Sequence, residues 1–199
     1  MSDHYRTLAD PVESRQKVER SEFLAVAFPV VSDEEFFAEL TRAQKKWFDA
    51  THHCWAFRLF AEDRSRSSDA GEPSGSAGRP ILAAIEGAEL HDTGVIVVRW
   101  YGGVKLGTGG LSRAYRETAA LALREATLRD RYIYTRIEVT VPYEAFNVVY
   151  RLVDPPHVVL AEERFAESTV FAFDVRAGRA ENFTQMLTEK RLAWRRMDD

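Results

Sequence analysis

The chain joins a strand to a helix through Arg99-Trp-Tyr-Gly-Gly-Val-Lys105-Leu-Gly-Thr-Gly-Gly-Leu-Ser-Arg113-Ala-Tyr-Arg116. The strand expected upstream, Val95–Tyr101, begins with an almost continuous apolar run, which favours burial on both faces. A helix is expected downstream over Leu111–Arg129, where alanines on one side would allow close packing. The stretch therefore predicts a sheet covered by a closely packed helix.

The same stretch predicts a site for an anion or a nucleic acid. No acidic residue lies between Asp92 and Glu117. Free amides at a helix N-terminus, a glycine loop and nearby cations are the components of phosphate sites. The candidate residues are Arg79, Arg99, Gly102, Gly103, Lys105, Gly107, Gly109, Gly110 and Arg113. A tight turn beside solvated cations is the alternative, because G-x-G-x-x-G is matched only at its start and no P-loop motif is present.

An earlier glycine-rich window, residues 67–80, places Asp69 and Glu72 among several hydroxyls. These carboxylates could act as a catalytic acid and base or bind a metal. Alternatively, Asp69 and the serines satisfy amides of the loop itself, as in Asx and ST turns. The second interpretation is favoured, so Asp69 and Glu72 are only the alternative catalytic residues.

His52, His53 and Cys54 suggest a metal or thiol site, but in a strand the middle residue faces away from the other two. We therefore expect no metal or cofactor site, and a structural, buried Cys54. The aromatic residues near the basic stretch could stack on exposed bases, although core packing is the default for large aromatics. They are Trp55, Trp100, Tyr101 and Tyr115.

Periodicity and capping signals predict further elements before residue 130. Ser32-Asp-Glu-Glu35 is a capping box that would begin a helix. The expected elements are a strand Glu22–Val31, a helix from the capping box to about Phe48, a strand Thr51–Phe60, a loop Ala61–Gly78 and a helix Pro80–Glu86.

After Asp130 glycine nearly disappears, and the pattern becomes strand, helix, strand, strand, helix, strand. This is the split βαβ order of ferredoxin-like domains. The expected elements include Tyr132–Val141, Tyr143–Leu152, His157–Phe165, Ser168–Val175 and a helix carrying Phe183, Met186 and Leu187. We therefore predict an α+β protein with two domains, residues 1–130 and 131–199.

Composition limits the function classes. The chain has 199 residues, of which 45% are hydrophobic, and a formal net charge of −4. No overall positive field would attract nucleic acid, so a basic site must be local. The apolar run Phe23–Val31 is too short to span a bilayer. The N-terminus lacks the layout of a secretory signal, and the single Cys54 cannot form an internal disulfide, so we expect a cytoplasmic protein without membrane contact.

Three stretches resemble the IMPACT family, and in particular its bacterial members. They are Ala50-Thr-His-His-Cys-Trp-Ala56, Ser68-Asp-Ala-Gly-Glu-Pro-Ser-Gly-Ser-Ala-Gly-Arg-Pro-Ile-Leu82 and Val97-Val-Arg-Trp-Tyr-Gly-Gly-Val-Lys-Leu-Gly-Thr-Gly-Gly-Leu-Ser-Arg-Ala-Tyr115. The chain departs from the family pattern at His53, Ala70, Ser76 and Trp100-Tyr101. Ala70 stands where the family usually has a second Asp, which weakens any metal proposal.

The resemblance implies an N-terminal α/β domain with a ribosomal-protein-type βαβ fold, similar to domain IV of elongation factor G. It also implies a C-terminal ferredoxin-like domain similar to domain V of that factor. Eukaryotic members of the family are translation regulators. We therefore expect a non-enzymatic protein that binds RNA or the ribosome and regulates translation. An enzyme acting on a small phosphorylated or peptidic substrate, and a protein-binding module, are the alternatives.

Overall fold

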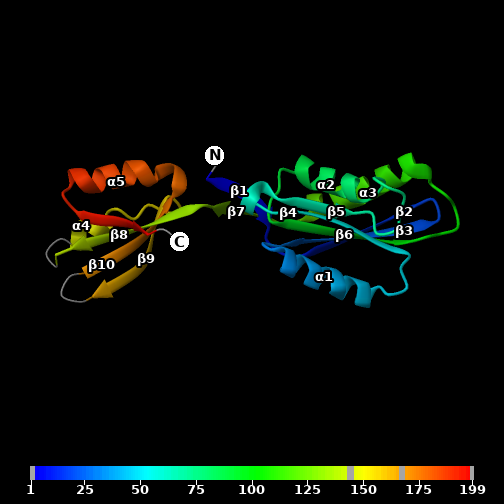
Figure 1. Ribbon diagram of the computed structural model, residues 1–199, viewed down its shortest axis with the longest axis horizontal. Helices are drawn as coiled ribbons and strands as arrows, with labels where there is room; N and C mark the ends of the chain where they lie inside the picture. Colours follow the sequence, from blue (N-terminus) through cyan, green and yellow to red (C-terminus); the bar gives the residue numbers. More distant parts are fainter. Residues whose placement is uncertain (1–2, 143–145, 166–168, 198–199) are drawn as a thin grey trace. The chain divides into compact units, whose positions relative to one another are not determined.

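The structure is a computed structural model that describes residues 3–142, 146–165 and 169–197 (Figure 1). The chain divides into two compact units. The larger unit is Tyr5–Arg131, and the residues on either side of it form the smaller unit. Strands β1 (His4–Leu8) and β7 (Leu128–Tyr132) pair in a two-stranded sheet.

The larger unit is built on a five-stranded sheet in the order β2-β3-β6-β4-β5, in which all neighbours are antiparallel. Because β3 and β4 are both antiparallel to β6, they are parallel to each other with β6 between them. Helix α1 connects β3 to β4, so this part is a split βαβ unit. The strands are β2 (Val12–Val18), β3 (Ser21–Pro29), β4 (His52–Arg58), β5 (Ser65–Ser68) and β6 (Thr93–Trp100).

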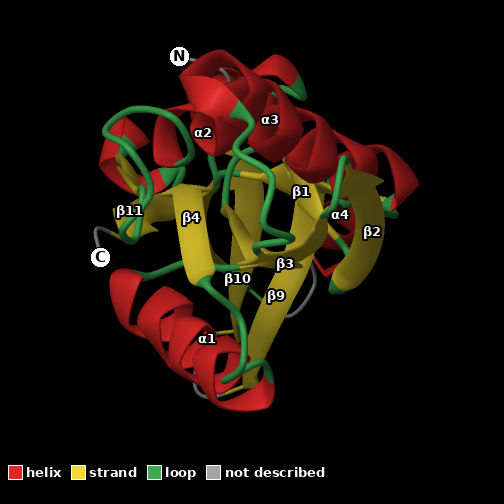
Figure 2. Cartoon of the chain, turned by 90° about the vertical axis from the view of Figure 1, so that its right-hand side faces the viewer, coloured by secondary structure: helices red, strands yellow, loops and turns green. Residues whose placement is uncertain are grey.

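Helices cover both faces of this sheet, as Figures 1 and 2 show. Helix α1 (Asp33–Lys46) packs on one face, and α2 (Gly78–Gly87) and α3 (Gly107–Glu125) pack on the other. The predicted capping box is present, since the Glu35 amide donates to Ser32 Oγ at 3.2 Å. Strand β6 is buried on both faces, as its apolar sequence predicts.

The smaller unit has the predicted order of elements. Its four strands form an antiparallel sheet in the order β11-β8-β10-β9, with α4 and α5 contributing to the apolar core on one face. The elements are β8 (Tyr134–Val141), α4 (Phe146–Tyr150), β9 (Val158–Phe165), β10 (Thr169–Arg176), the short helix η3 (Ala177–Arg179), α5 (Ala180–Glu189) and β11 (Ala193–Met197).

Several sequence predictions need correction. Residues 61–78, predicted as a loop, contain the short helix η1 (Ala61–Asp63) and the edge strand β5. Helix α3 begins four residues before its predicted start and ends at Glu125, so that Leu128 is already in a strand. Strands β1 and β2 were not predicted.

Parts of two predicted elements lie outside the described residues, namely 143–145 of the helix Tyr143–Leu152 and position 168 at the start of the next-to-last strand. In the described part of the chain, no helix is both long enough and apolar enough to cross a bilayer.

Candidate nucleic-acid interface

The two glycine-rich windows meet in space through a buried ion pair. Arg99 Nη1, at the end of β6, donates to Glu72 Oε1 at 2.6 Å, and the side chains are 5% and 4% exposed. The same carboxylate oxygen accepts a hydrogen bond of 2.7 Å from the Tyr115 hydroxyl on α3. The loop before α2 is therefore bound to β6 and α3.

Arg99 is held on several sides. Its Nη2 donates to Ser21 Oγ at 3.1 Å, and its guanidinium lies over the rings of Phe23 and Tyr101. Its Nε is buried without a hydrogen-bond partner among the described residues. The sequence predicted Arg99 as a cation available to a ligand, whereas the structure gives it an internal carboxylate partner. Glu72, 27 residues upstream, carries no local signal of this pairing.

Asp69 organises the loop that precedes α2. Its Oδ1 accepts from the amides of Ala77 and Gly78, and its Oδ2 accepts from the amide of Gly75, at 2.8–2.9 Å. Burial raises the pKa of this carboxyl, but these amides and the nearby Arg79 together lower it, so the pKa lies below its ordinary value of 3.8. Of the two interpretations of Asp69, the structure bears out the one in which it satisfies loop amides.

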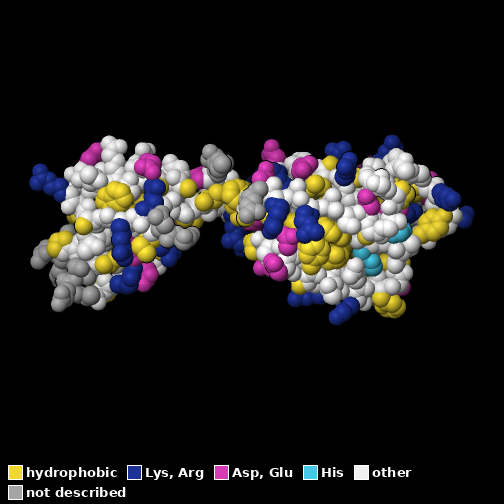
Figure 3. Space-filling view, viewed as in Figure 1, with side chains coloured by type: hydrophobic (Ala, Val, Ile, Leu, Met, Phe, Trp, Pro, Cys, Tyr) yellow, Lys and Arg dark blue, Asp and Glu magenta, His cyan; other side chains and the backbone are white. Residues whose placement is uncertain are grey.

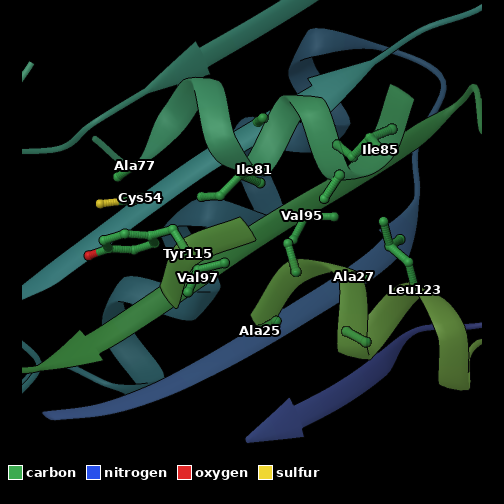
Figure 4. Packing of buried hydrophobic residues seen from close by; sticks show 14 of the residues in the cluster. Ala25, Ala27, Cys54, Ala77, Ile81, Ile85, Val95, Val97, Tyr115 and Leu123 are labelled. Atoms are coloured by element: carbon green, nitrogen blue, oxygen red, sulfur yellow. The ribbon is translucent and has the colours of Figure 1, made fainter. Parts of the chain in front are cut away.

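Cys54 lies in the core on the α2 and α3 side of the sheet, beside Tyr115 (Figure 4). The thiol donates to the carbonyl oxygen of Asp69 at 2.9 Å. Burial raises the pKa of the Cys54 thiol to about 12, so the thiolate is not formed at neutral pH. Among the described residues, no group of three or more His, Cys, Asp or Glu side chains could hold a metal ion.

The second glycine window contains one close approach and two left-handed positions. A Cβ at Gly102 would lie 1.7 Å from the carbonyl oxygen of Arg20, so only glycine fits there. Gly103 and Gly107 have φ of +84° and +68°. Gly109 lies in open space. Gly102, Gly103 and Gly107 therefore shape the turn, and Gly109 leaves the first turn of α3 open to solvent.

The N-terminus of α3 has no side-chain cap and no acidic residue in its first turn. It borders a pocket of about 350 Å³, where Lys105 is exposed and forms no ion pair with any described residue. The uncapped helix end and this lysine are two of the components from which the anion site was predicted, and the site stays a prediction. The pocket is lined by Glu72, Pro73, Arg99, Tyr101, Lys105, Leu106, Gly107, Thr108 and Leu111.

The remaining candidates lie outside this pocket. Arg113 is exposed one turn further along α3, where it lines a neighbouring hollow with Gly109. Gly110 lies close to Leu106, since a Cβ added at position 110 would be 3.1 Å from the Cβ of Leu106. Arg79 is exposed on α2 and is not among the residues that line the pocket at the start of α3.

The aromatic candidates separate into two groups. Trp55 and Tyr115 are buried in the two cores, so packing accounts for them. Trp100 is partly buried and lies beneath the guanidinium of Arg15. Tyr101 is 44% exposed and lines the pocket beside Lys105. Of the four, Tyr101 is the ring most accessible to a base.

Comparison with known proteins identifies the family of this chain. Residues 19–123 match the model of the Impact N-terminal domain. An IMPACT family member of Thermus thermophilus is 40% identical over 161 residues, covering 81% of this chain and 87% of that protein. IMPACT family member YigZ of Escherichia coli is 35% identical, covering 72% of each chain. A crystal structure of a hypothetical protein has 25% sequence identity, covers all of both chains and superposes with a TM-score of 0.70. The chain therefore belongs to the IMPACT family.

Proposed function

We propose that this protein binds RNA, free or within the ribosome, and regulates translation without catalysing a reaction. The observation that carries the proposal is the uncapped N-terminus of α3 beside the exposed Lys105, which forms no ion pair within the described part of the chain. Phosphates are favourable ligands for such a site, because the helix end offers both amides and partial positive charge. Arg113, one turn further along, would contact a neighbouring phosphate.

The positive charge at the start of α3 is local, because the protein as a whole is slightly negative. Figure 3 shows Lys and Arg side chains interspersed with Asp and Glu over the visible surface. The net charge of −4 gives no general attraction for RNA. Binding at the start of α3 would therefore depend on a few identified cations, which makes it testable by single substitutions.

The carboxylates of the alternative enzymatic hypothesis are already engaged. Asp69 accepts hydrogen bonds from three amides, and Glu72 accepts from Arg99 and Tyr115. A general base works best with a pKa near the working pH. The lowered pKa of Asp69 is far from that range, which supports binding over acid–base catalysis.

The family supports the same proposal. Relatives of this chain include the mammalian proteins named Protein IMPACT, for example that of mouse, at 37% identity. The resemblance to domains IV and V of elongation factor G, and the role of eukaryotic members in translation, favour a ribosomal partner in the cytoplasm.

The test is a titration of fluorescently labelled ribosomal RNA with the intact protein at several salt concentrations. Replacing Lys105 and Arg113 together with Gln should weaken binding and reduce the salt slope by about two units, or about one per lost phosphate contact. Lys45→Gln on α1 is the control, because it removes an exposed charge that pairs with no described residue; it should change neither quantity beyond its general charge effect.

Identical affinities and slopes for the double variant and the control would contradict the proposal. A partner that remains bound stoichiometrically after nuclease treatment and at high salt would instead support the protein-binding alternative.

A further inference from the structure

A groove runs along the outer side of α3, next to α2, beyond the pocket at the start of α3. It consists of two hollows of about 290 and 450 Å³ that share Arg116, Ala120 and Arg124. The first is also lined by Ala83, Ala84, Gly87, Ala88 and Leu123, and the second by Gly109, Ser112, Arg113 and Glu117.

Three arginines line this groove and have no internal partner. Arg113, Arg116 and Arg124 are exposed, and none forms an ion pair or hydrogen bond through its side chain with another described residue. At a rise of 1.5 Å per residue, the row from Arg113 to Arg124 extends about 16 Å along the helix. Glu117 is the one acidic side chain among the groove residues, so cations exceed anions by two.

The other side chains of the groove indicate how a ligand would approach. The residues Ala83, Ala84 and Gly87 of α2, and Ala88 at its C-cap, are small, and a Cβ at Gly87 would meet no atom within 4 Å. A bulky polymer backbone can therefore approach the arginines without displacing long side chains. The groove residues include no aromatic ring.

The absence of aromatic side chains from the groove residues favours double-stranded over single-stranded RNA as the ligand. Proteins that bind single strands combine a basic groove with aromatic side chains on which bases stack. Double-stranded RNA is recognised mainly by its shape and through its phosphates and 2′-hydroxyls. The arginine row extends about 16 Å, which is long enough to contact several successive phosphates along one strand of an A-form RNA duplex.

We propose that the α2–α3 groove binds the phosphate backbone of a double-stranded RNA segment, through Arg113, Arg116 and Arg124. This proposal rests on the proposed RNA-binding function and extends it to a second contact surface and to duplex structure. Contacts to phosphates carry no sequence information, so binding in the groove is expected to be independent of base sequence.

The test uses the intact protein and labelled hairpin RNA, with an unpaired RNA of equal length as the comparison. Arg116→Gln with Arg124→Gln should weaken hairpin binding by about tenfold and lower the salt slope by about two units. Arg42→Gln with Lys45→Gln on α1, on the opposite face of the sheet, removes the same formal charge and is the control, although Arg42 is paired with Glu39 at the surface. The control should reproduce the wild-type salt slope.

A gain of affinity provides a second measurement that misfolding cannot imitate. Glu117→Gln removes the acidic side chain from the groove and should strengthen hairpin binding about twofold to fivefold, with a steeper salt dependence. Glu39→Gln on α1 is the corresponding control and should leave hairpin affinity within its experimental error.

Each outcome bears on one proposal or on both. If Lys105→Gln weakens binding but the Arg116 and Arg124 variant behaves like its control, the groove proposal is wrong and the proposed function stands. If the unpaired RNA, or polyglutamate used as an acidic protein competitor, binds the groove as tightly as the hairpin, the duplex assignment is overturned. If the wild-type protein binds no RNA, both proposals fail.

Discussion

Glu72 and Arg99 form an ion pair of 2.6 Å in which the side chains are 4% and 5% exposed. Glu72 comes from the loop before α2, and Arg99 from the end of β6, next to the turn that leads to α3. A buried charge without its partner is costly, whereas an intact pair is nearly neutral in free energy. This pair therefore fixes the relative position of the two glycine-rich windows.

Glu72→Gln should destabilise the protein by about 3–5 kcal/mol, because it leaves the Arg99 guanidinium buried without a compensating charge. The free energy of unfolding can be measured by urea denaturation, followed by tryptophan fluorescence. Glu89→Gln is the control, since Glu89 pairs with Arg6 at the surface and its loss should cost less than about 1 kcal/mol. Equal, small effects of both substitutions would show that the Glu72–Arg99 pair does not hold the loop.

Asp69→Ala should cost about 2–3 kcal/mol at pH 7, because three amides at the start of α2 lose their acceptor. The pKa of Asp69 is lower in the folded than in the unfolded chain, where it is near 3.8. Its contribution to stability is therefore complete above about pH 5, and it is lost as the pH falls through the folded-state pKa.

The measurement for Asp69 is the difference in unfolding free energy between wild type and variant from pH 7 to pH 3. We expect this difference to shrink below about pH 4. Asp69→Asn, which keeps a neutral acceptor, should recover part of the stability. A difference that stays constant down to pH 3 would argue against the charged carboxylate as the source of the effect.

Gly102→Ala and Gly109→Ala should affect stability differently, although both add a single methyl group. The methyl group at Gly102 would overlap the carbonyl oxygen of Arg20, so we expect a loss of about 1–3 kcal/mol or more. At Gly109 the space is open and the residue is helical, so a neutral result or a gain of up to about 1 kcal/mol is expected. Thermal unfolding of both variants compares them, and a stable Gly102→Ala protein would disprove the close approach.

Local signals in the sequence were sufficient for much of the fold. The capping interaction of Ser32 with Glu35 depends on residues three positions apart, and the apolar run in β6 reflects burial on both faces. The order of elements after residue 130 also followed from periodicity alone. Each of these features involves neighbours in the chain, which is why sequence patterns could predict it.

The misplaced elements depend on distant partners. Glycine disfavours helices, so a start of α3 at Gly107 was not expected from propensity. The segment Ser65-Arg-Ser-Ser68 has a sequence typical of a loop, but it forms strand β5 because it pairs with β4. The pairing of Glu72 with Arg99 likewise depends on tertiary structure, so the sequence left Arg99 as a candidate ligand for phosphate.

Strand β5 has a further consequence for the behaviour of the protein in solution. It forms one border of the five-stranded sheet, where a long apolar strand would offer unsatisfied backbone groups to other molecules. This border has only four residues, and Arg66 within it pairs with Asp33 on α1. A strand that is short and carries an ordered charge is a poor template for pairing, so this side of the sheet resists aggregation.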